Sequence, residues 1–443
     1  MLLDNPFGRT RQIVQRHGGW RSAISRLRQI LQKEGVAGIV WRARFLLGAR
    51  NSPNLESPSS AIHRDVGATM RGGVRSVMLT GHPYLVSGRG EDVRTGARAF
   101  ATTDVSFGLC NTFPWGAQNA AMYADFPLVD LIDEPMETSV NIFFLNADEM
   151  ASAHHHLGKR FFEGKYNIGY WAWELSEFPD AWCDAFRYVQ EIWAPSRFTM
   201  EAIARKATCP VIHMPLPVEL PALHGITRQD LDLPENGFLF LFFFDFSSFM
   251  NRKNPWAVIK AFERAFQDLN HHAAYLVVKL NGGHLRPDDY RQFLAEVASL
   301  QSNVRLIDKV LNARSMSALM NACDCFVSLH RAEGFGRGPA EAMCCGKPVI
   351  VTGYSGNMDF TNEANACIVD YQLIPVGPAE YPFGEGQKWA DADVEQAAWY
   401  MRRVYEDAKF REQIARAGKH FISANHSFSA VGSRYRRRLS RLN

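Results

Sequence analysis

Short apolar segments alternate with helical stretches along most of this chain, and the alternation begins twice. The second series opens with FLFLFFF at 238–244, an unbroken apolar run expected of a strand that is buried on both faces. Strands that alternate with helices predict a parallel sheet. The strand candidates of the first series are VRSVMLTG, SVNIFFLNA, YNIGYWAW and EIWAPS, and those after FLFLFFF are AYLVVKL, VRLID, CFVSL and KPVIVT.

Two such series predict an α/β protein with two doubly wound, Rossmann-like domains that face a cleft. A chain of 443 residues is long enough for two domains with large cores. Ligands of such sheets bind beyond the carboxyl ends of the strands. The expected segments are a basic helical extension at 1–50, a linker at 51–73, an N-terminal domain at 74–220, a C-terminal domain at 235–405, and helices at 406–443 that cross back to the N-terminal domain.

The first 50 residues differ from the rest in charge. They hold ten Arg or Lys residues and two acids, a net charge of +8, while the remaining residues sum to −5. Apolar residues at helical spacing, with Trp20 and Trp41 among them, predict basic amphipathic helices. Such helices favour an anionic membrane surface. Packing on the two domains or on a second copy of the chain is the alternative.

The remaining composition points to the cytoplasm. No apolar run reaches the ~18 residues of a membrane span, and Asp4 interrupts the start of the chain where a cleavable signal needs apolar residues. The eight cysteines form no CxxC pair, which favours buried thiols in a reducing compartment. We expect a cytoplasmic protein, peripheral on the inner face of the plasma membrane if residues 1–50 bind lipid, with no nucleic-acid partner. The oligomeric state stays open.

The segment HRAEGFGRGPAEAMCCGKPVIVT at 330–352 carries the sharpest chemical signal. It places a glycine-containing loop and a short helix between two strands, and the N–H groups at such a helix start favour a diphosphate. Glu333 and Glu341 lie eight positions apart, one before the loop and one expected in the first turn of the helix. They are therefore able to contact different parts of one ligand. A surface acid and a helix-capping carboxylate are the alternatives. Three glycines, Gly334, Gly336 and Gly338, are expected to let the backbone approach that ligand.

EGFGRGPAEAMCCGKPVI resembles the E-x7-E signature of retaining glycosyltransferase family 4, which has the GT-B fold. TGYSGNMDF with Asp359, APSRF at 194–198 and RKNPWAVIKAFERAF at 252–266 fit the same family, so the resemblance spans roughly residues 75–430. It implies that Glu333 lies near the donor sugar, that Glu341 binds the ribose hydroxyls, and that Lys253 contacts the donor diphosphate. It also implies transfer without a metal or other cofactor. The donor-binding set is completed by Arg252, Ser247, Lys279, Gly334, Phe335, Gly336, Arg337 and Gly338.

One position departs from the family pattern. The family has an arginine about six residues before the lysine, and this chain has Ser247 there. Departure of a nucleoside diphosphate builds negative charge, which a protein without a metal must stabilise itself. Arg252 or Arg337 is the candidate replacement. Lys279, expected just after a strand, either reaches the nucleotide or extends along the surface with its ammonium in water.

The N-terminal domain offers further candidates. Gly88 and Gly90 are expected to open a helix after the first strand, and the resemblance places this loop near the donor phosphates and the acceptor. Arg89 or Arg94 is then a candidate contact, with a helix surface as the alternative. Glu174 occupies the region where many family members have a histidine, which makes it an acceptor-side residue or the base. The expected catalytic residues are thus Glu333, Lys253 and Glu174.

Other features are assigned to structure. Trp171 and Trp173 are expected in the core, with a sugar stacked on an exposed indole as the alternative. The run His154, His155 and His156 does not predict a metal site, because adjacent residues of a helix point in different directions.

The resulting function hypothesis is a retaining transfer of a hexose from a nucleotide-diphosphate sugar to a glycan or lipid-linked glycan. HRAEGFG and SGNMDF resemble bacterial enzymes of lipopolysaccharide, O-antigen or exopolysaccharide assembly, in which mannose from a GDP donor is one option. Another GT-B activity, such as a nucleotide-sugar epimerase or a sugar phosphorylase, is the alternative enzyme. A non-catalytic scaffold of a polysaccharide assembly complex is the alternative outside enzymes.

Overall fold

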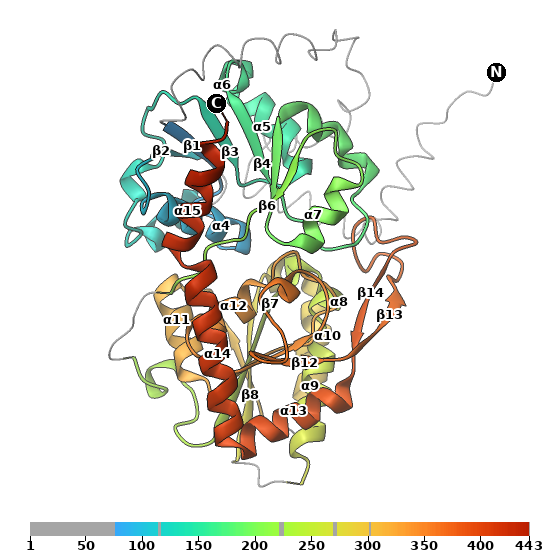
Figure 1. The fold of residues 1–443 in the computed structure, drawn as a ribbon. Coiled ribbons are helices and arrows are strands. Elements are labelled where there is room, and N and C mark those ends of the chain that lie inside the picture. The colour runs from blue at the N-terminus through green and yellow to red at the C-terminus, as the bar shows by residue number, and fades with distance from the viewer. Residues whose placement is uncertain (1–75, 114–116, 221–225, 269–272, 301–302, 443) are drawn as a thin grey trace, which may run out of the picture. The chain divides into compact units, whose positions relative to one another are not determined.

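The computed structural model describes residues 76–442 apart from 114–116, 221–225, 269–272 and 301–302, and these residues all belong to one compact unit (Figure 1). They form two parallel six-stranded sheets and a two-stranded antiparallel one. The predicted α/β architecture of two doubly wound domains is therefore confirmed. The predicted basic extension at 1–50 and the linker at 51–73 lie outside the described residues.

The N-terminal sheet has the strand order β2-β1-β3-β4-β5-β6, and each neighbouring pair is parallel. Its strands are β1 (Ser76–Gly81), β2 (Ser106–Asn111), β3 (Val140–Phe143), β4 (Tyr166–Tyr170), β5 (Glu191–Ala194) and β6 (Val211–His213). Its helices are α4 (Gly88–Phe100), α5 (Met150–Leu157), α6 (Lys159–Phe162) and α7 (Arg197–Ala204), with 3-10 segments η2 (Ala117–Tyr123), η3 (Val129–Leu131), η4 (Ala147–Glu149) and η5 (Asp180–Tyr188). The sequence pattern did not predict β2 and β6, the two edge strands of this sheet: β6 has only three residues, and β2 mixes apolar residues with Ser, Gly and Asn.

The C-terminal sheet has the order β12-β11-β10-β7-β8-β9. Its strands are β7 (Phe238–Asp245), β8 (Ala274–Asn281), β9 (Val304–Asp308), β10 (Cys325–Ser328), β11 (Val349–Thr352) and β12 (Cys367–Val369). Its helices are α8 (Met250–Lys253), α9 (Pro255–Phe266), α10 (Pro287–Ala298), α11 (Ala313–Ala322) and α12 (Arg337–Cys344), with 3-10 segments η6 (Gln229–Leu231), η7 (Phe246–Ser248), η8 (Gly283–Leu285) and η9 (Gly356–Asp359).

The run FLFLFFF forms β7 near the middle of its sheet, as its composition predicts. Successive side chains of a strand point to opposite faces. Leu239 and Leu241 accordingly join one hydrophobic cluster, and Phe240, Phe242 and Phe244 join another, in which they pack with α9. A central strand covered by helices on both faces needs apolar residues at every position, which explains the absence of alternation.

Three helices, α13 (Val394–Glu406), α14 (Ala408–His426) and α15 (Phe428–Leu439), end the chain, and α14 packs on α12 while α15 packs on α4 of the N-terminal half (Figure 1). Tyr435 of α15 stacks on Phe100 at 4.9 Å and on Trp193 at 5.1 Å between ring centroids. A Cβ on Gly432 would lie 2.4 Å from the carbonyl oxygen of Ala99, so only glycine permits this approach of the two helices.

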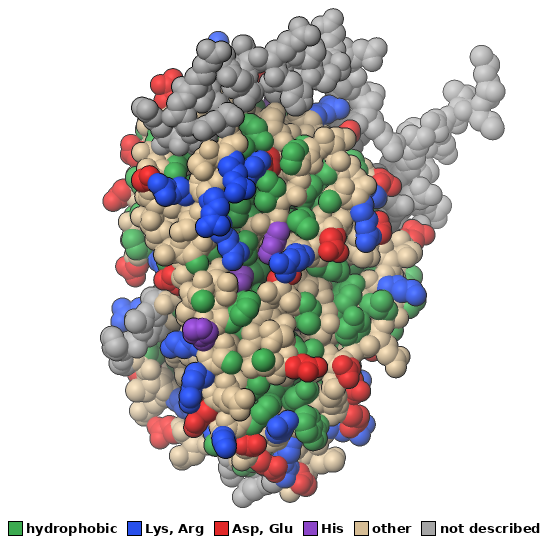
Figure 2. Space-filling model, viewed as in Figure 1, with side chains coloured by type: hydrophobic (Ala, Val, Ile, Leu, Met, Phe, Trp, Pro, Cys, Tyr) green, Lys and Arg blue, Asp and Glu red, His purple; other side chains and the backbone are tan. Residues whose placement is uncertain are grey.

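Arginines gather on the surface over α15 (Figure 2). Arg438 pairs with the fully buried Glu191 of β5, and Arg436 pairs with Asp104. These ion pairs fasten α15 to the N-terminal half. Among the described helices, none is long and apolar enough to span a lipid bilayer.

Candidate active site

The glycine loop after β10 leads into α12, whose N-cap is Gly336 with φ +94°. The carbonyl of Gly334 accepts hydrogen bonds from Ser196 Oγ (2.6 Å) and Thr199 Oγ1 (3.1 Å), which belong to the start of α7 in the N-terminal half. The glycine loop is thereby joined to the other domain.

Two residues of this segment, Gly338 and Phe335, have packing roles in the structure. A Cβ on Gly338 would lie 2.9 Å from the Phe326 ring and 3.0 Å from the Phe243 ring, so this glycine permits α12 to pack on the sheet. Phe335 is 5% exposed and packs against Phe360 and His426. Both residues are in the predicted donor-binding set, and both have a packing role in the structure.

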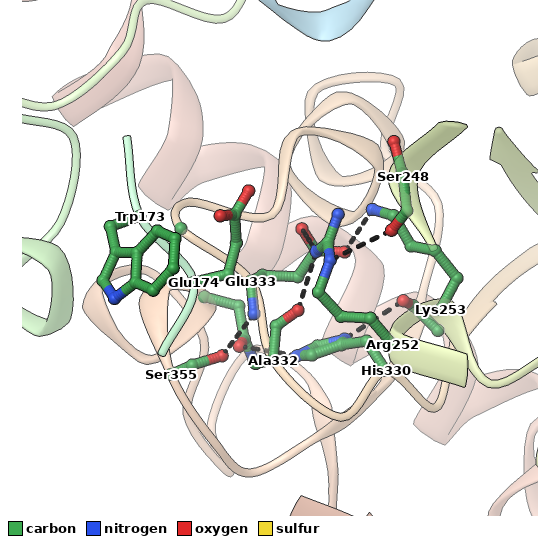
Figure 3. Close-up of polar contacts among 12 residues, drawn as sticks. Trp173, Glu174, Ser248, Arg252, Lys253, His330, Ala332, Glu333 and Ser355 are labelled. Atoms are coloured by element: carbon green, nitrogen blue, oxygen red, sulfur yellow. Dashed lines mark hydrogen bonds and ion pairs between the residues drawn. The ribbon is translucent and has the colours of Figure 1, made fainter. Parts of the chain in front are cut away.

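Glu333 lies between two cations from the segment that follows β7 (Figure 3). Its Oε1 accepts from Lys253 Nζ at 2.5 Å and its Oε2 from Arg252 Nη1 at 3.1 Å. The backbone N–H of Glu333 donates to Ser355 Oγ at 2.8 Å, which fixes the residue further. The structure therefore brings together two of the predicted catalytic residues.

The Glu333 carboxylate is charged at neutral pH. Burial acts to raise the pKa of Glu333, but the neighbouring Lys253 and Arg252 outweigh it and lower that pKa to about 2. Arg252 also donates to the carbonyls of Ala332 (2.8 Å) and Ser248 (3.2 Å), and its side chain is 5% exposed. Lys253 is 20% exposed. Arg252 is thus the more buried partner of Glu333, and Lys253 is the more exposed one.

Glu341 is the fifth residue of α12, so the expectation that it lies in the first helical turn is wrong. The loop extends as far as Gly336, and the helix begins only at Arg337, which leaves Glu341 in the second turn. Arg337 Nη1 lies 3.8 Å from Glu341 Oε1, while Arg337 Nη2 donates to Asp92 Oδ1 of α4 at 2.5 Å. Arg337 therefore bridges the two halves and is closer to Asp92 than to Glu341.

The carboxyl group of Glu341 consequently has a pKa raised to about 7. Burial is the main cause, Arg337 opposes it, and the acids Glu91 and Asp92 add to the rise. No sequence pattern indicated Asp92 as a neighbour of this site.

At the position of the missing family arginine, Ser247 Oγ donates to Asp245 Oδ1 at 2.5 Å. Lys279 lies within β8 instead of after it and is 7% exposed, so the reading as a surface lysine is wrong. Burial lowers its pKa, while Asp245 and Asp308 oppose that shift. Lys279 therefore lies close to Asp245, the last residue of β7.

In the N-terminal half, Gly88 and Gly90 do open a helix, α4, and Ser87 caps it. A Cβ on Gly90 would lie 2.0 Å from the Leu85 carbonyl oxygen, which only glycine avoids. Arg89 donates to Asp92 Oδ2 (2.8 Å) and to the Tyr170 carbonyl (2.7 Å). Arg94 donates to Glu91 and to two backbone carbonyls. Both candidate arginines are therefore engaged in contacts within their own domain.

Glu174 follows β4 and accepts a hydrogen bond from the hydroxyl of Tyr381 at 2.7 Å. Trp171 and Trp173 are buried, as predicted. Asp148 and Glu149 also lie on this side of the site, in η4 after β3. Burial, followed by the charges of Glu149 and Glu174, raises the pKa of Asp148 to about 6.

Sequence reasoning missed Asp148, Glu149 and Tyr381. For the first two a signal existed, because Asp148 and Glu149 directly follow the predicted strand SVNIFFLNA, and ligands of a parallel sheet bind beyond such strand ends. His154, on α5, packs against Phe162 of α6 and Tyr188 of η5. Within the described residues, no group of His, Cys, Asp and Glu side chains is arranged to hold a metal ion.

Residues 226–374 match the family model described as "Glycosyl transferases group 1". None of the curated proteins matches the chain at a significant level. Among solved structures, HepE from Anabaena in complex with UDP and glucose is similar with a TM-score of 0.57 and 16% identity, over 83% of this chain and 99% of that one. A glycosyltransferase from Rickettsia africae is similar with a TM-score of 0.57 and 12% identity, over 83% and 98% of the two chains.

Sucrose-phosphate synthase from Thermosynechococcus elongatus is also similar, with a TM-score of 0.57 and 12% identity, over 82% of this chain and 97% of that one. At these identities the likeness establishes the fold. The protein therefore has the GT-B fold, and its C-terminal half contains a glycosyltransferase group 1 domain.

Proposed function

We propose that this protein transfers a hexose from a nucleotide-diphosphate sugar to a glycan or lipid-linked glycan, with retention of configuration and without a metal ion. The observation that carries the proposal is the group formed by Glu333, in the loop before α12, with Arg252 and Lys253 of α8. It combines a permanently ionised carboxylate with an accessible cation at the end of a parallel sheet, where a GT-B domain binds its ligands.

Each part of a nucleotide sugar finds a matching group in this arrangement. The start of α12 and Lys253 stabilise the diphosphate, because the helix dipole and the ammonium both favour negative charge. Their effect grows as the bond to the sugar breaks, since the leaving diphosphate gains charge in the transition state. Glu341 accepts hydrogen bonds from ribose hydroxyls, and Glu333 orients the donor sugar.

On the acceptor side, Glu174 takes the role of the group that contacts the attacking hydroxyl. A retaining displacement with a carboxylate nucleophile would need a second carboxylate beside the donor sugar. Glu333 is tied to two cations and acts as an orienting group. We therefore favour transfer on the front face, in which an oxygen of the leaving diphosphate receives the acceptor proton.

Nucleotide binding and transfer test this proposal together. The purified chain, stripped with a chelator, is screened by thermal shift against UDP, GDP and their hexose conjugates; UDP comes first because the similar Anabaena structure holds it. Lys253→Ala should weaken binding of the diphosphate at least about tenfold, as loss of one charge-assisted contact costs about 1.5–3 kcal/mol. Full activity that appears only with added magnesium or manganese would contradict metal independence. Release of nucleoside diphosphate without an acceptor would favour an epimerase.

Our proposal for the acceptor and for the cellular location rests on the segment of residues 1–50. Its charge of +8 and its amphipathic pattern support binding to an anionic membrane surface from the cytoplasmic side, where a lipid-linked acceptor of polysaccharide assembly would lie. The full chain should sediment with anionic vesicles, less so at high salt, and a chain that lacks residues 1–50 should not. Equal sedimentation of both would argue against this location.

A further inference from the structure

The hairpin of β13 (Tyr371–Pro375) and β14 (Lys388–Ala392) belongs to neither six-stranded sheet. Its connecting loop, residues 376–387, is here called the arm. The arm lies beyond the family match, which ends at residue 374. At its base, Ala390 N donates to the Arg331 carbonyl at 3.0 Å, only two residues before Glu333. The hairpin that carries the arm is therefore anchored close to Glu333.

One side of the arm contacts the segment that carries the donor-site cations. The ring of Tyr381 packs against Phe249 at 5.0 Å between centroids, and the guanidinium of Arg252 lies 5.8 Å from the same ring. Asn251 Nδ2 donates to Glu380 Oε1 at 3.0 Å. Tyr381 is thus in contact with the same arginine that holds Glu333.

The other side of the arm contacts the N-terminal half. Tyr381 donates to Glu174 Oε2 at 2.7 Å, and its ring also packs on Trp173 at 5.8 Å. Gln387 exchanges hydrogen bonds with the backbone of Glu177. The arm therefore holds the loop after β4 by several contacts, of which the Tyr381 hydroxyl is the one that reaches a carboxylate.

The arm adopts a costly backbone conformation around Tyr381. Ala379 and Phe383, two residues on either side of it, have φ values of +62° and +55°. Residues with a side chain rarely occupy this region, and they persist there when surrounding contacts hold them. Such a conformation is expected where one side chain must be placed accurately.

We propose that Tyr381 is a positioning residue that holds the Glu174 carboxylate, so that Oε1 of Glu174 faces the hydroxyl of the acceptor. This inference rests on the proposed transfer function and adds a residue to it. Glu174 Oε2 accepts from Tyr381, and Oε1 accepts no hydrogen bond from the described residues. In Figure 3 the Glu174 carboxylate stands near the Glu333 group, on the side where Trp173 lies.

The direction of the hydrogen bond follows from the environment of Tyr381. Burial raises the pKa of the phenol well above its ordinary value, and the charge of Glu174 raises it further. The phenol therefore stays protonated and donates, while the carboxylate accepts. A fixed donor restricts the rotation of the carboxylate, which is what accurate placement of a reacting hydroxyl requires.

Tyr381→Phe tests the inference because it removes one oxygen and keeps the ring with its contacts. We expect kcat for transfer to fall about 10–100-fold, as misplacement of a reacting group does, with the KM for the donor within about twofold of the parent because the donor contacts remain. In the Glu174→Gln background the same change should have no further effect, since the two side chains act as one unit. Tyr371→Phe on the same hairpin is the matched control and should leave kcat unchanged, because its ring packs on Tyr354, away from Glu174.

The outcomes separate this inference from the proposed function. Parental kcat in Tyr381→Phe would overturn the positioning role while transfer itself stands. Equal, additive losses from Tyr381→Phe in both backgrounds would also overturn it, because they would indicate a structural effect independent of Glu174. A parent chain that binds nucleotide sugars but transfers nothing to any acceptor would overturn the proposed function and this inference with it.

Discussion

Glu333 and Glu341 belong to one short motif, yet the structure gives them opposite electrostatic surroundings. Glu333 is held by two cations at 2.5 and 3.1 Å, and its pKa falls to about 2. Glu341 has one cation at 3.8 Å, shared with Asp92, and its pKa rises to about 7. Both carboxyl groups are buried, so burial alone does not decide their charge.

The pKa of each glutamate depends on whether the neighbouring cation is also paired with another acid. Desolvation raises the pKa of any buried acid, and a close cation reverses the shift only if its charge is not already neutralised by another acid. Arg337 lies closer to Asp92 than to Glu341, whereas Lys253 and Arg252 both contact Glu333. One glutamate is therefore permanently charged and the other changes its charge near neutral pH.

Glu333→Gln is expected to have the largest effect on stability and on turnover. Removing the shared carboxylate leaves Lys253 and Arg252 without a counter-ion, which costs about 3–5 kcal/mol for a buried pair. The partly exposed Lys253 places the value near the lower end. Turnover should fall as well, since the donor sugar loses its orienting group. Urea denaturation at pH 7 measures the free energy of unfolding, with a nucleotide-transfer assay beside it.

The sign of its pH dependence follows from the lowered pKa. A carboxyl group with a folded pKa of about 2 stabilises the protein above its unfolded pKa, and this contribution is lost as the pH falls through about 2. The difference between the parent and Glu333→Gln should thus be constant from pH 8 to about pH 5. A difference that disappears already by pH 6 would show that Glu333 is not held as described.

Glu341→Gln should have the opposite sign and a smaller size. A folded pKa of about 7 means that Glu341 binds a proton more tightly in the folded state, so its contribution is full below the unfolded pKa and is lost as the pH rises through about 7. The parent should therefore lose up to about 3 kcal/mol of stability between pH 4.5 and pH 8 from this group alone. The glutamine variant should lack that slope, and at pH 8 it should exceed the parent in stability.

Urea midpoints across this pH range give the measurement, with Glu333→Gln as the comparison. Parallel curves for the parent and Glu341→Gln would mean that Glu341 titrates normally and that the contrast between the two glutamates does not exist.

The smallest effect is expected when Asp92, the acid that shares Arg337 with Glu341, is replaced. Asp92→Asn removes one acid near Glu341 and releases the Arg337 guanidinium from its nearer partner. The pKa of Glu341 should then fall, by about one unit or less, which corresponds to about 1.4 kcal/mol at most. Carbon-13 NMR titration of the side-chain carboxyl detects the shift. Asp104→Asn, which breaks the exposed pair with Arg436, is the matched control and should leave the midpoint in place.

Much of the fold was predictable because the information is local. The apolar run of β7 and the series of strand candidates predicted two parallel sheets, and the glycine loop before a helix predicted where a ligand would bind. The edge strands β2 and β6 were not predicted, since β6 has only three residues, β2 mixes apolar residues with small and polar ones, and their pairing comes from neighbouring strands. The packing role of Gly338 was not predictable, because the Phe243 and Phe326 rings that it packs on lie in other strands.

Local sequence patterns were sufficient to predict the α/β architecture and the glycine loop and helix within residues 330–352. They also contain the E-x7-E motif that resembles a glycosyltransferase. These follow from the periodicity of apolar residues and from short motifs, which need no knowledge of distant contacts. Only the tertiary structure decided which carboxylate keeps its charge and which residue holds Glu174. Arg337 and Asp92 are 245 positions apart in the chain, and Tyr381 and Glu174 are 207 apart. Electrostatic interactions depend on distance and burial in space, and folding alone sets both.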